Sequence, residues 1–311
     1  MARTLGQAGL HQAQKAKKDE FHTQLCDIER ELVHYEHHFA GKVVLCNCDD
    51  IAVSNFARYF TANFARLGLK RLLCTCYSPT GHGSYGCFDG TTFVRTELTG
   101  SGDFRSPECQ EILAQADIVV TNPPFSLFRP YLAQLIDYGK HFLCISNINA
   151  ITYKDVFSLI ARNQVWLGVN LGRGISGFIV PEHYPLYGLE TKINEQGQRI
   201  VATNNCMWLT NLDHAARHDF LPLTQRYMGH EDSYPRYDNC AAINVNRTKD
   251  IPRDYSGLMG VPITFLHKFN PAQFEVVRFR KGDDGKDLKI AGKPTYFRIL
   301  IRPRSAPNQT A

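Results

Sequence analysis

The 311-residue chain lacks the long apolar stretches that a membrane protein needs. No segment approaches the roughly 18 continuous apolar residues of a membrane-spanning helix. Residues 1–20 include Lys15, Lys17 and Lys18 but no apolar core, which is unlike a secretory signal peptide. We therefore expect a cytoplasmic protein that makes no contact with a membrane.

The sequence also lacks C-x-x-C pairs, although it contains ten cysteines, so no structural zinc motif is present. Cys46/Cys48 and Cys74/Cys76 are C-x-C pairs in two expected strands, where a period of two places both members of a pair on one face. A four-sulfur metal site is one interpretation. Buried free thiols are the interpretation that we favour, because free cysteine packs as a small hydrophobic residue, and no metal is expected.

Phosphate-binding loops are missing as well. The chain has no Walker-type loop, and both matches to G-x-G-x-x-G, at residues 81–86 and 172–177, lead into strand-like runs instead of helices. Glycine is absent from residues 43–67 altogether. These features argue against a nucleotide triphosphatase or a nicotinamide-dependent enzyme.

What the sequence does contain is an alternation of helical and strand patterns over its first two thirds. This alternation predicts an α/β fold with a parallel sheet and helices on both faces. The expected helices are residues 27–39, 53–67, 106–115, 128–138 and 154–162. The expected strands are residues 42–48, 69–76, 117–121, 142–146, 165–169, 177–180 and 207–212.

Charge and composition change near residue 215. Residues 1–216 contain 19 Lys and Arg against 20 Asp and Glu, whereas residues 217–311 contain 16 against 10. The C-terminal part is also rich in prolines and irregular in its hydrophobic pattern. We expect one domain over residues 1–215 and a basic region over 216–311 that suits a polyanionic partner.

The segment Val119 to Ser126 carries the clearest chemical signal. An apolar run stops at Asn122-Pro123-Pro124-Phe125, and the prolines prevent further strand pairing. Asn122 and Phe125 should therefore project from the carboxyl end of a strand, where α/β sheets bind ligands. An amide oxygen, the Pro123 carbonyl and an aromatic ring suit the binding and methylation of an exocyclic amine.

A second polar site is expected one strand-helix unit upstream. Asp103 and Phe104 lie in a loop before a helix, where the carboxylate can accept a hydrogen bond from an adenine amino group and the ring can pack on the base. Ser106 is suited to cap that helix. Further upstream, residues 18–24 precede the first helix, and Cys46-Asn47-Cys48-Asp49-Asp50 ends the first strand.

These motifs, in this order, resemble those of S-adenosylmethionine-dependent N6-adenine DNA methyltransferases. Residues 120–128, 166–184, 205–212, 259–274 and 296–301 are similar to the EcoRI-type adenine methyltransferases, so the resemblance covers almost the whole chain. It implies a Rossmann-like methyltransferase sheet, with S-adenosylmethionine as cofactor and a smaller, irregular C-terminal DNA-recognition region.

The resemblance also implies roles for individual residues. Asn122, Pro123, Pro124 and Phe125 match the catalytic tetrapeptide of the family. The residues that we expect to bind the cofactor are Phe21, Thr23, Cys46, Asp49, Asp50, Asp103 and Phe104. This chain lacks the glycine-rich turn that most methyltransferases carry after the first strand, and the second strand ends in Cys74-Thr75-Cys76-Tyr77 without an acid, so the ribose ligand stays unassigned.

The expected substrate is double-stranded DNA, with the inner adenine of GAATTC as the implied target. Candidate DNA-binding residues in the basic region are Arg247, Lys249, Arg253, Lys268, Arg278, Arg280 and Lys281. We expect a monomer, and a cognate restriction endonuclease could act on the same site without a stable complex. Two alternatives stay open: methylation of RNA adenine or protein glutamine, and a DNA-binding protein without catalysis.

Overall fold

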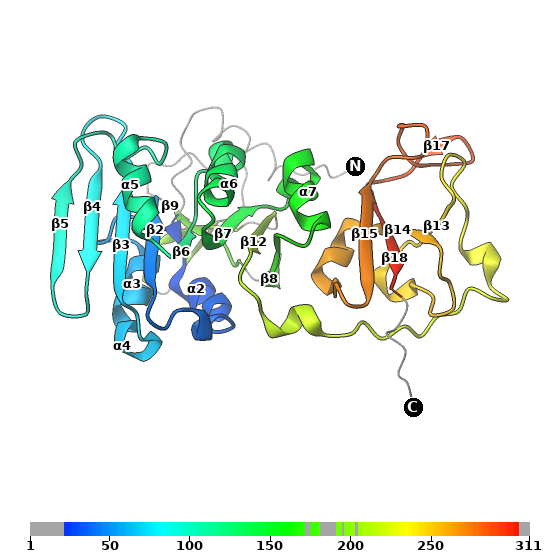
Figure 1. Ribbon diagram of the computed structural model, residues 1–311, viewed down its shortest axis with the longest axis horizontal. Helices are drawn as coiled ribbons and strands as arrows, with labels where there is room; N and C mark the ends of the chain where they lie inside the picture. The colour runs from blue at the N-terminus through cyan, green and yellow to red at the C-terminus, as the bar shows by residue number, and fades with distance from the viewer. Residues whose placement is uncertain (1–21, 172–174, 181–190, 195, 203–204, 305–311) are drawn as a thin grey trace. The chain divides into compact units, whose positions relative to one another are not determined.

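The computed structural model describes residues 22–171, 175–180, 191–194, 196–202 and 205–304 (Figure 1). The chain forms two compact units, each built from two stretches of sequence. The first unit comprises Met1–Ala150 and Leu167–Asp213, and the second comprises Ile151–Trp166 and His214–Ala311. The boundary expected at residue 215 lies next to the end of the first unit, but residues 151–166, expected in the N-terminal domain, lie in the second. None of the helices in the described part of the chain has the length and apolar character needed to cross a bilayer.

An eight-stranded mixed sheet forms the centre of the first unit, in the order β5-β4-β3-β2-β6-β7-β12-β8. Its strands are β2 (Val43–Asn47), β3 (Arg71–Cys76), β4 (Ser84–Phe88), β5 (Phe93–Glu97), β6 (Ile118–Thr121), β7 (His141–Asn147), β8 (Trp166–Leu171) and β12 (Cys206–Thr210). The pairs β2/β3, β2/β6 and β6/β7 are parallel, whereas β3/β4, β4/β5 and β7/β12 are antiparallel. The prediction of a parallel sheet is therefore correct for the four central strands and wrong for β4, β5 and β12.

Burial explains which strands could be recognised from sequence. All residues of β2 and β6 are buried, as expected for central strands covered on both faces, and both were predicted. β4 was expected to be part of a loop because it begins inside the glycine-rich run 81–86. Gly86 is needed there, since a Cβ atom would overlap the side chain of Ile51. The edge strand β5 is exposed along its whole length.

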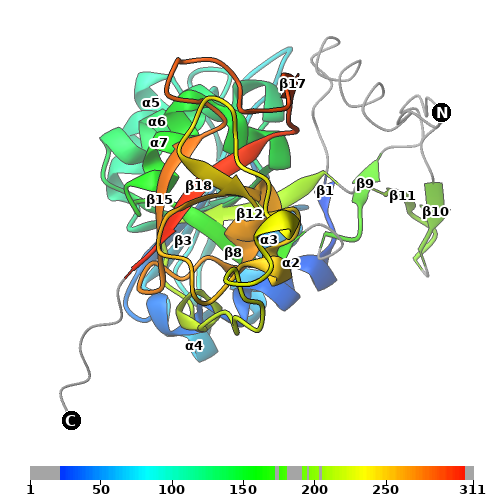
Figure 2. The ribbon, with the colours of Figure 1, turned by 90° about the vertical axis from the view of Figure 1, so that its right-hand side faces the viewer.

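The described residues of the first unit form the helices α2 (Leu25–Leu32), α3 (Asn55–Ala62), α4 (Phe64–Leu67), α5 (Pro107–Gln115) and α6 (Phe128–Asp137). Figure 2 shows α5 and α6 on one side of the sheet and α2 on the other. The predicted helix 53–67 is interrupted at Asn63, between α3 and α4. Ser106 caps α5, since its hydroxyl accepts a hydrogen bond from the amide of Cys109.

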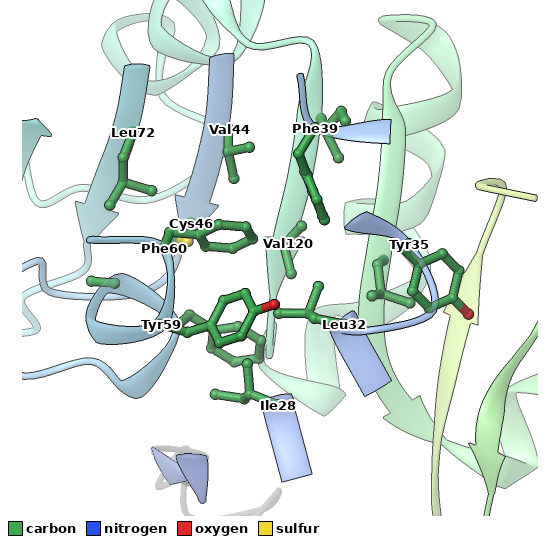
Figure 3. Close-up of a cluster of buried hydrophobic side chains, with 14 of the residues drawn as sticks. Ile28, Leu32, Tyr35, Phe39, Val44, Cys46, Tyr59, Phe60, Leu72 and Val120 are labelled. Atoms are coloured by element: carbon green, nitrogen blue, oxygen red, sulfur yellow. The ribbon is translucent and has the colours of Figure 1, made fainter. Parts of the chain in front are cut away.

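A hydrophobic core lies between the sheet and the helices α2 and α3 (Figure 3). Alternate strand residues such as Val44 and Leu72 contribute to this core together with Ile28 of α2 and Phe60 of α3. The rings of Phe60 and Phe39 meet edge to face, with their centres 5.3 Å apart. Each such side chain stabilises the fold by about 1.5–3 kcal/mol through burial.

A small antiparallel sheet, in the order β1-β9-β11-β10, completes the first unit. Its strands are β1 (His22–Thr23), β9 (Phe178–Val180), β10 (Thr191–Ile193) and β11 (Arg199–Val201). In its register His22 is opposite Ile179, and Thr23 is opposite Phe178. The sheet thus joins the chain before α2 to a segment about 155 residues later in the sequence.

The second unit contains a four-stranded sheet in the order β13-β14-β18-β15, together with a short hairpin. Its elements are α7 (Lys154–Ala161), β13 (Ala242–Asn244), β14 (Leu258–Pro262), β15 (Phe274–Phe279), β16 (Lys289–Ile290), β17 (Lys293–Pro294) and β18 (Arg298–Pro303). The irregular composition did not predict this sheet, whose centre is the fully buried run Ile299–Ile301.

Short 3-10 helices connect many of these elements. They are η1 (Glu36–His38), η2 (Phe125–Leu127), η3 (Ile148–Thr152), η5 (Ala215–His218), η6 (Glu231–Ser233), η7 (Thr248–Asp250) and η8 (Ile263–Lys268). The predicted helix 27–39 is therefore α2 followed by a turn and η1. After β6, the 3-10 helix η2 begins at Phe125, directly after the two prolines, and α6 follows it.

Candidate active site

The four central strands are parallel, so their carboxyl ends lie at one edge of the sheet. Three chain segments with polar or aromatic side chains leave the strands there: residues 48–50 after β2, Tyr77 after β3 and residues 122–125 after β6. This edge is where sheets of this kind bind ligands. The expected catalytic and cofactor-binding segments are thus brought to the same end of the sheet.

The Asn122–Phe125 segment leaves β6 without further strand pairing. Asn122 is half-buried and its side-chain oxygen is shielded from solvent. Pro123 is buried, and the half-buried ring of Phe125 packs against the hydrophobic core. The centre of this ring lies 6.2 Å from that of Phe178, with an angle of 66° between the planes. An amide and an aromatic ring are therefore presented next to each other at the end of a buried strand.

Phe178 connects this segment to Thr23, which is its partner across the β1/β9 strand pair. Thr23 is buried, and its hydroxyl oxygen has no hydrogen-bond partner within the described residues. Its carbonyl accepts a hydrogen bond of 2.8 Å from the side-chain amide of Asn55, at the start of α3. Phe21, expected to bind the cofactor, lies outside the described residues. Phe178 was not among the predicted site residues, although it directly follows the second G-x-G-x-x-G match.

Asp49 lies between α3 and β6. The Ser54 hydroxyl donates to its Oδ1 at 2.6 Å, and the Thr121 hydroxyl lies 2.7 Å from its Oδ2. Ser54 also caps α3 by accepting from the amide of Phe56. Burial raises the pKa of Asp49 to about 6, although both hydroxyl contacts oppose that rise. A carboxyl group at this edge of the sheet therefore titrates close to neutral pH.

Cys48 takes the backbone conformation that glycine adopts in a glycine-rich turn. Its φ is +75°, a left-handed value that costs a residue with a side chain about 1–2 kcal/mol. The chain therefore makes the turn after β2 without glycine. Cys46, two residues earlier, is fully buried in the core beside α2 and α3, and Cys74 is its partner on β3. Its thiol is accordingly part of the core packing.

Asp50 is held by the antiparallel edge strands. Arg95 of β5 donates to both carboxylate oxygens, with Nη2 2.6 Å from Oδ2 and Nε 3.3 Å from Oδ1. Ser84 of β4 also donates to Oδ2. Burial alone would raise the pKa of Asp50, but the hydrogen bonds from Arg95 and from the amide of Ala52 hold it below its usual range. This carboxylate ties the turn after β2 to β4 and β5.

Asp103 is partly exposed and forms a two-point ion pair with Arg105. Arg105 Nε lies 2.9 Å from Oδ1 and Nη2 lies 2.6 Å from Oδ2, and these hydrogen bonds lower the pKa of Asp103. Phe104 is buried instead, with its ring edge to face against Tyr131 at 5.0 Å. Asp103 is therefore accessible to a ligand, whereas Phe104 supports the loop from behind.

The loop that carries Asp103 contacts the end of β3. The amide of Ser78 donates to the carbonyl of Ser101 at 2.8 Å. Gly102 has a φ of +79°, and a Cβ there would overlap the Cys76 carbonyl oxygen. Tyr77, exposed between these contacts, is a candidate cofactor contact that was not predicted. Its position directly after the predicted strand 69–76 could have indicated Tyr77 as a cofactor contact.

Two buried carboxylates of α2 hold the segment that precedes Phe178. Glu31 accepts hydrogen bonds of 2.8 Å from the amides of Val169 and Asn170 and one of 2.9 Å from the Tyr35 hydroxyl. Asp27 accepts from the amide and the hydroxyl of Ser176, both at 2.9 Å. Burial raises the pKa of both carboxylates. Both residues therefore position the chain that presents Phe178 to Phe125.

The candidate DNA-binding residues of the second unit fall into two groups. The first group forms ion pairs: Arg247 with Asp250, Arg278 with Asp283, and both Arg280 and Lys281 with Asp287. The second group consists of Lys249, Arg253 and Lys268, which are exposed and have no ion-pair partner among the residues that the structure describes. The structure does not gather the seven residues into one unpaired cluster.

All ten cysteines are free thiols, six of them buried. Within the described residues, no group of three or more His, Cys, Asp or Glu side chains is arranged to hold a metal ion. The sulfur atoms of the two C-x-C pairs thus form no ligand set in this part of the chain.

A mixed α/β sheet that carries Asn-Pro-Pro-Phe at the carboxyl end of a central parallel strand defines an enzyme of the methyltransferase class. Comparison with known proteins gives the family. Residues 9–94 and 84–299 match the model of the adenine-specific methyltransferase EcoRI family. The chain belongs to this family, and the prediction of an adenine-specific DNA methyltransferase of a restriction-modification system is confirmed.

Three relatives match over nearly their whole length. The type II methyltransferase M.EcoRI of Escherichia coli is 58% identical, covering 97% of this chain and 98% of the relative. M.MgeORF184P of Mycoplasma genitalium is 37% identical and M.MpnI of Mycoplasma pneumoniae is 36% identical, each covering 94% of this chain and 98% of the relative. No solved structure matches the chain. Family membership implies S-adenosylmethionine as cofactor and DNA as substrate.

Proposed function

We propose that this chain transfers a methyl group from S-adenosylmethionine to N6 of an adenine flipped out of duplex DNA, at the site GAATTC. The observation that carries the proposal is the Asn122–Phe125 segment at the carboxyl end of β6, with Phe125 beside Phe178. The 58% identity to M.EcoRI supports the site GAATTC. A base inside a duplex cannot reach this segment, so the adenine must leave the stack at a cost of a few kcal/mol.

Asn122 and the Pro123 carbonyl would hold the acceptor amine. Both oxygens accept hydrogen bonds, and Pro123 has no amide hydrogen that would compete. As methyl transfer proceeds, the N6 nitrogen becomes tetrahedral and positively charged, which strengthens these hydrogen bonds relative to the ground state. The methylated nitrogen then loses one of its protons, which gives the neutral product. Stacking of the adenine on Phe125 would return about 1–3 kcal/mol of the cost of flipping.

The residues on the neighbouring strands fit the cofactor. When bound, S-adenosylmethionine supplies an electrophilic methyl group on a sulfonium centre. The buried Thr23 hydroxyl, which lacks a partner within the described residues, would accept a hydrogen bond from the methionine end. Asp49 would attract the positive charge, and Asp103 would accept from the adenine amino group after releasing part of its contact with Arg105.

The other expected cofactor residues receive supporting roles in this proposal. Asp50 holds β4 and β5 through Arg95, Phe104 packs behind Asp103, and Cys46 fills the core. We keep Phe21 as a contact to the methionine end on the basis of the family resemblance. Tyr77 would pack on the adenine of the cofactor, because it follows β3 next to the Asp103 loop.

The second unit would provide the DNA contacts. Lys249, Arg253 and Lys268 are exposed, which suits contacts with phosphates. Arg247, Arg278 and Lys281 must loosen their ion pairs before they can bind DNA. The protein would act as a monomer in the cytoplasm, and a restriction endonuclease that cleaves the same site would be its biological counterpart without forming a stable complex.

A labelled-methyl transfer assay tests the proposal. Wild-type protein should label duplex DNA that contains GAATTC at the inner adenine, and should label duplexes with one altered base pair much less. Asn122→Ala should lose turnover while keeping its affinity for S-adenosylmethionine. Gln115→Ala, which removes an exposed amide from α5, is the matched control and should behave as wild type. Full activity of Asn122→Ala would contradict the catalytic role of this residue.

A further inference from the structure

A row of aromatic rings in the second unit ends in an exposed tyrosine. Phe157 of α7 contacts Phe279 of β15, with ring centres 5.1 Å apart, and Phe279 contacts Phe297 at 6.1 Å. Tyr296 stacks on Phe297, with ring centres 5.2 Å apart and an angle of only 23° between the planes. The side chain of Tyr296 is 74% exposed, so the outermost ring of the row faces solvent.

The guanidinium group of Arg280 strengthens this row. Its central carbon lies 4.4 Å from the centre of the Phe297 ring, and the same group is paired with Asp287. The hydrogen bond from Arg280 is the main reason that the pKa of Asp287 falls to about 2. Arg280 is therefore engaged on both sides, and its position fixes Phe297 beneath Tyr296.

The hairpin that precedes Tyr296 is also held firmly. Asp238 accepts hydrogen bonds from both turn amides, from Ala291 at 3.1 Å and from Gly292 at 2.7 Å. Thr295 donates through its amide and its hydroxyl to the carbonyl of Leu288, whose side chain is buried. The backbone that precedes Tyr296 is thus held by several hydrogen bonds, which lowers the backbone entropy lost when the ring binds a partner.

The hairpin that precedes Tyr296 and the turn before it carry three lysines. Lys286 and Lys293 are exposed, and Lys289 is half-buried. None of the three forms an ion pair within 4 Å in the described part of the chain, in contrast to Arg278, Arg280 and Lys281. Lys286 nevertheless helps to lower the pKa of the neighbouring Asp284. An exposed aromatic ring that directly follows a lysine-bearing hairpin suits a base framed by phosphates.

From these contacts we infer that Tyr296 is a base-stacking residue, which inserts its ring against a base step of the DNA substrate while the hairpin lysines contact phosphates. This inference rests on the proposed function, because it assigns a binding mode to the same DNA. Aromatic and apolar side chains that insert in this way partly unstack the duplex. Arg280, expected to contact DNA directly, acts instead as a positioning residue beneath the stack.

Binding to a GAATTC duplex, measured by fluorescence anisotropy over a range of salt concentrations, tests this inference. Tyr296→Ala should weaken binding between about 5-fold and about 150-fold, the range expected for loss of one stacked base. The slope of log Kd against log salt should not change, since no phosphate contact is lost. Lys293→Ala should lower that slope by about one contact, and Tyr296→Phe should retain wild-type affinity.

Phe220→Ala is the matched control. Phe220 is also exposed, at 68%, but no stacked ring lies beneath it among the described residues, so this variant should bind DNA as wild type does. Binding of S-adenosylmethionine by each variant verifies that it is folded. Wild-type affinity of Tyr296→Ala, or a reduced salt slope in that variant, would overturn the inference. Failure of the wild-type chain to methylate duplex DNA would instead refute the proposed function, so the two failures can be told apart.

Discussion

Replacement of Asp49 by asparagine should remove a titration that affects both folding and cofactor binding. The pKa of Asp49 is about 6 in the folded chain, against an ordinary value of 3.8, because the carboxylate is desolvated. Below pH 3.8 the group is protonated in both the folded and the unfolded chain. Between pH 3.8 and pH 6 the folded chain holds a proton that the unfolded chain has lost, so the stability provided by the protonated form disappears as the pH rises.

The size of the effect follows from this shift. A difference of about two pKa units corresponds to roughly 3 kcal/mol of unfolding free energy, lost between about pH 4 and about pH 7. An asparagine side chain does not titrate, so the stability of Asp49→Asn relative to wild type should improve by about that amount over the same range. Denaturant unfolding followed by fluorescence can measure this, because Trp208 is fully buried in the core near Phe56.

The pH dependence of cofactor binding tests the ionisation of Asp49 independently. If ionised Asp49 attracts the sulfonium centre, the affinity for S-adenosylmethionine at pH 5 should be about tenfold below its plateau at neutral pH, since only about a tenth of the chains carry the charge. Asp49→Asn should bind more weakly at pH 8 and show no such dependence. Titration calorimetry between pH 5 and pH 8 provides the measurement.

Asp50→Asn is the matched control for both experiments. Arg95 keeps the pKa of Asp50 below its usual range, so Asp50 does not titrate between pH 5 and pH 8. This variant should lose stability at every pH in that range without changing the pH dependence. The reasoning about Asp49 is refuted if Asp49→Asn and wild type show parallel pH profiles in both unfolding and cofactor affinity.

Substitutions at four further positions test the contacts described above. Glu31→Ala should lower the unfolding free energy by about 3 kcal/mol in denaturant titrations, because one buried and two partly buried donors lose their acceptor; a loss below about 1 kcal/mol would contradict this. Cys48→Gly should be at least as stable as wild type, whereas Cys48→Val should lose more than about 1 kcal/mol, because its φ of +75° suits glycine and penalises a branched side chain; thermal unfolding distinguishes the two. Ala291→Gly should stabilise the second unit by up to about 1 kcal/mol, since the turn residue has a φ of +48°, and unchanged thermal stability would argue against strain there. Phe178→Ala should lower methyl transfer more than tenfold but leave duplex binding within a few-fold of wild type, measured in parallel; equal losses in both would indicate a general defect.

The parts of the fold that the sequence predicted are those dictated by local pattern. Continuous apolar runs marked β2 and β6, and the prolines after Thr121 marked the end of β6. β4 was missed because glycine disfavours a strand locally, while its close contact with Ile51 can be known only in three dimensions. At the break between α3 and α4 the side-chain amide of Asn63 donates to the carbonyl of Tyr59, a capping contact that the hydrophobic pattern of residues 53–67 does not show.

The candidate site shows a similar division. The positions of Asn122 and Asp49 followed from strand ends, because parallel strands place their carboxyl ends at one edge. The pairing of Asp50 with Arg95 depends on β5, whose exposed pattern carried little information about its neighbour. The position of Phe178 beside Phe125 depends on long-range contacts, among them a strand pair between segments about 155 residues apart, which hydrophobic patterning cannot predict.

The order of the two units along the chain restricts how specificity could be exchanged between members of the family. The chain leaves the first unit after β7, contributes residues 151–166 with α7 to the second unit, and returns to the first unit at Leu167, within β8. The buried face of α7, including Phe157, packs within the second unit against β15 and its neighbours. A chimera joined at the single position 215 would therefore combine α7 of one parent with the β15 of another. Three junctions are needed to transfer the second unit intact. Two lie on either side of residues 151–166, and the third lies near residue 213.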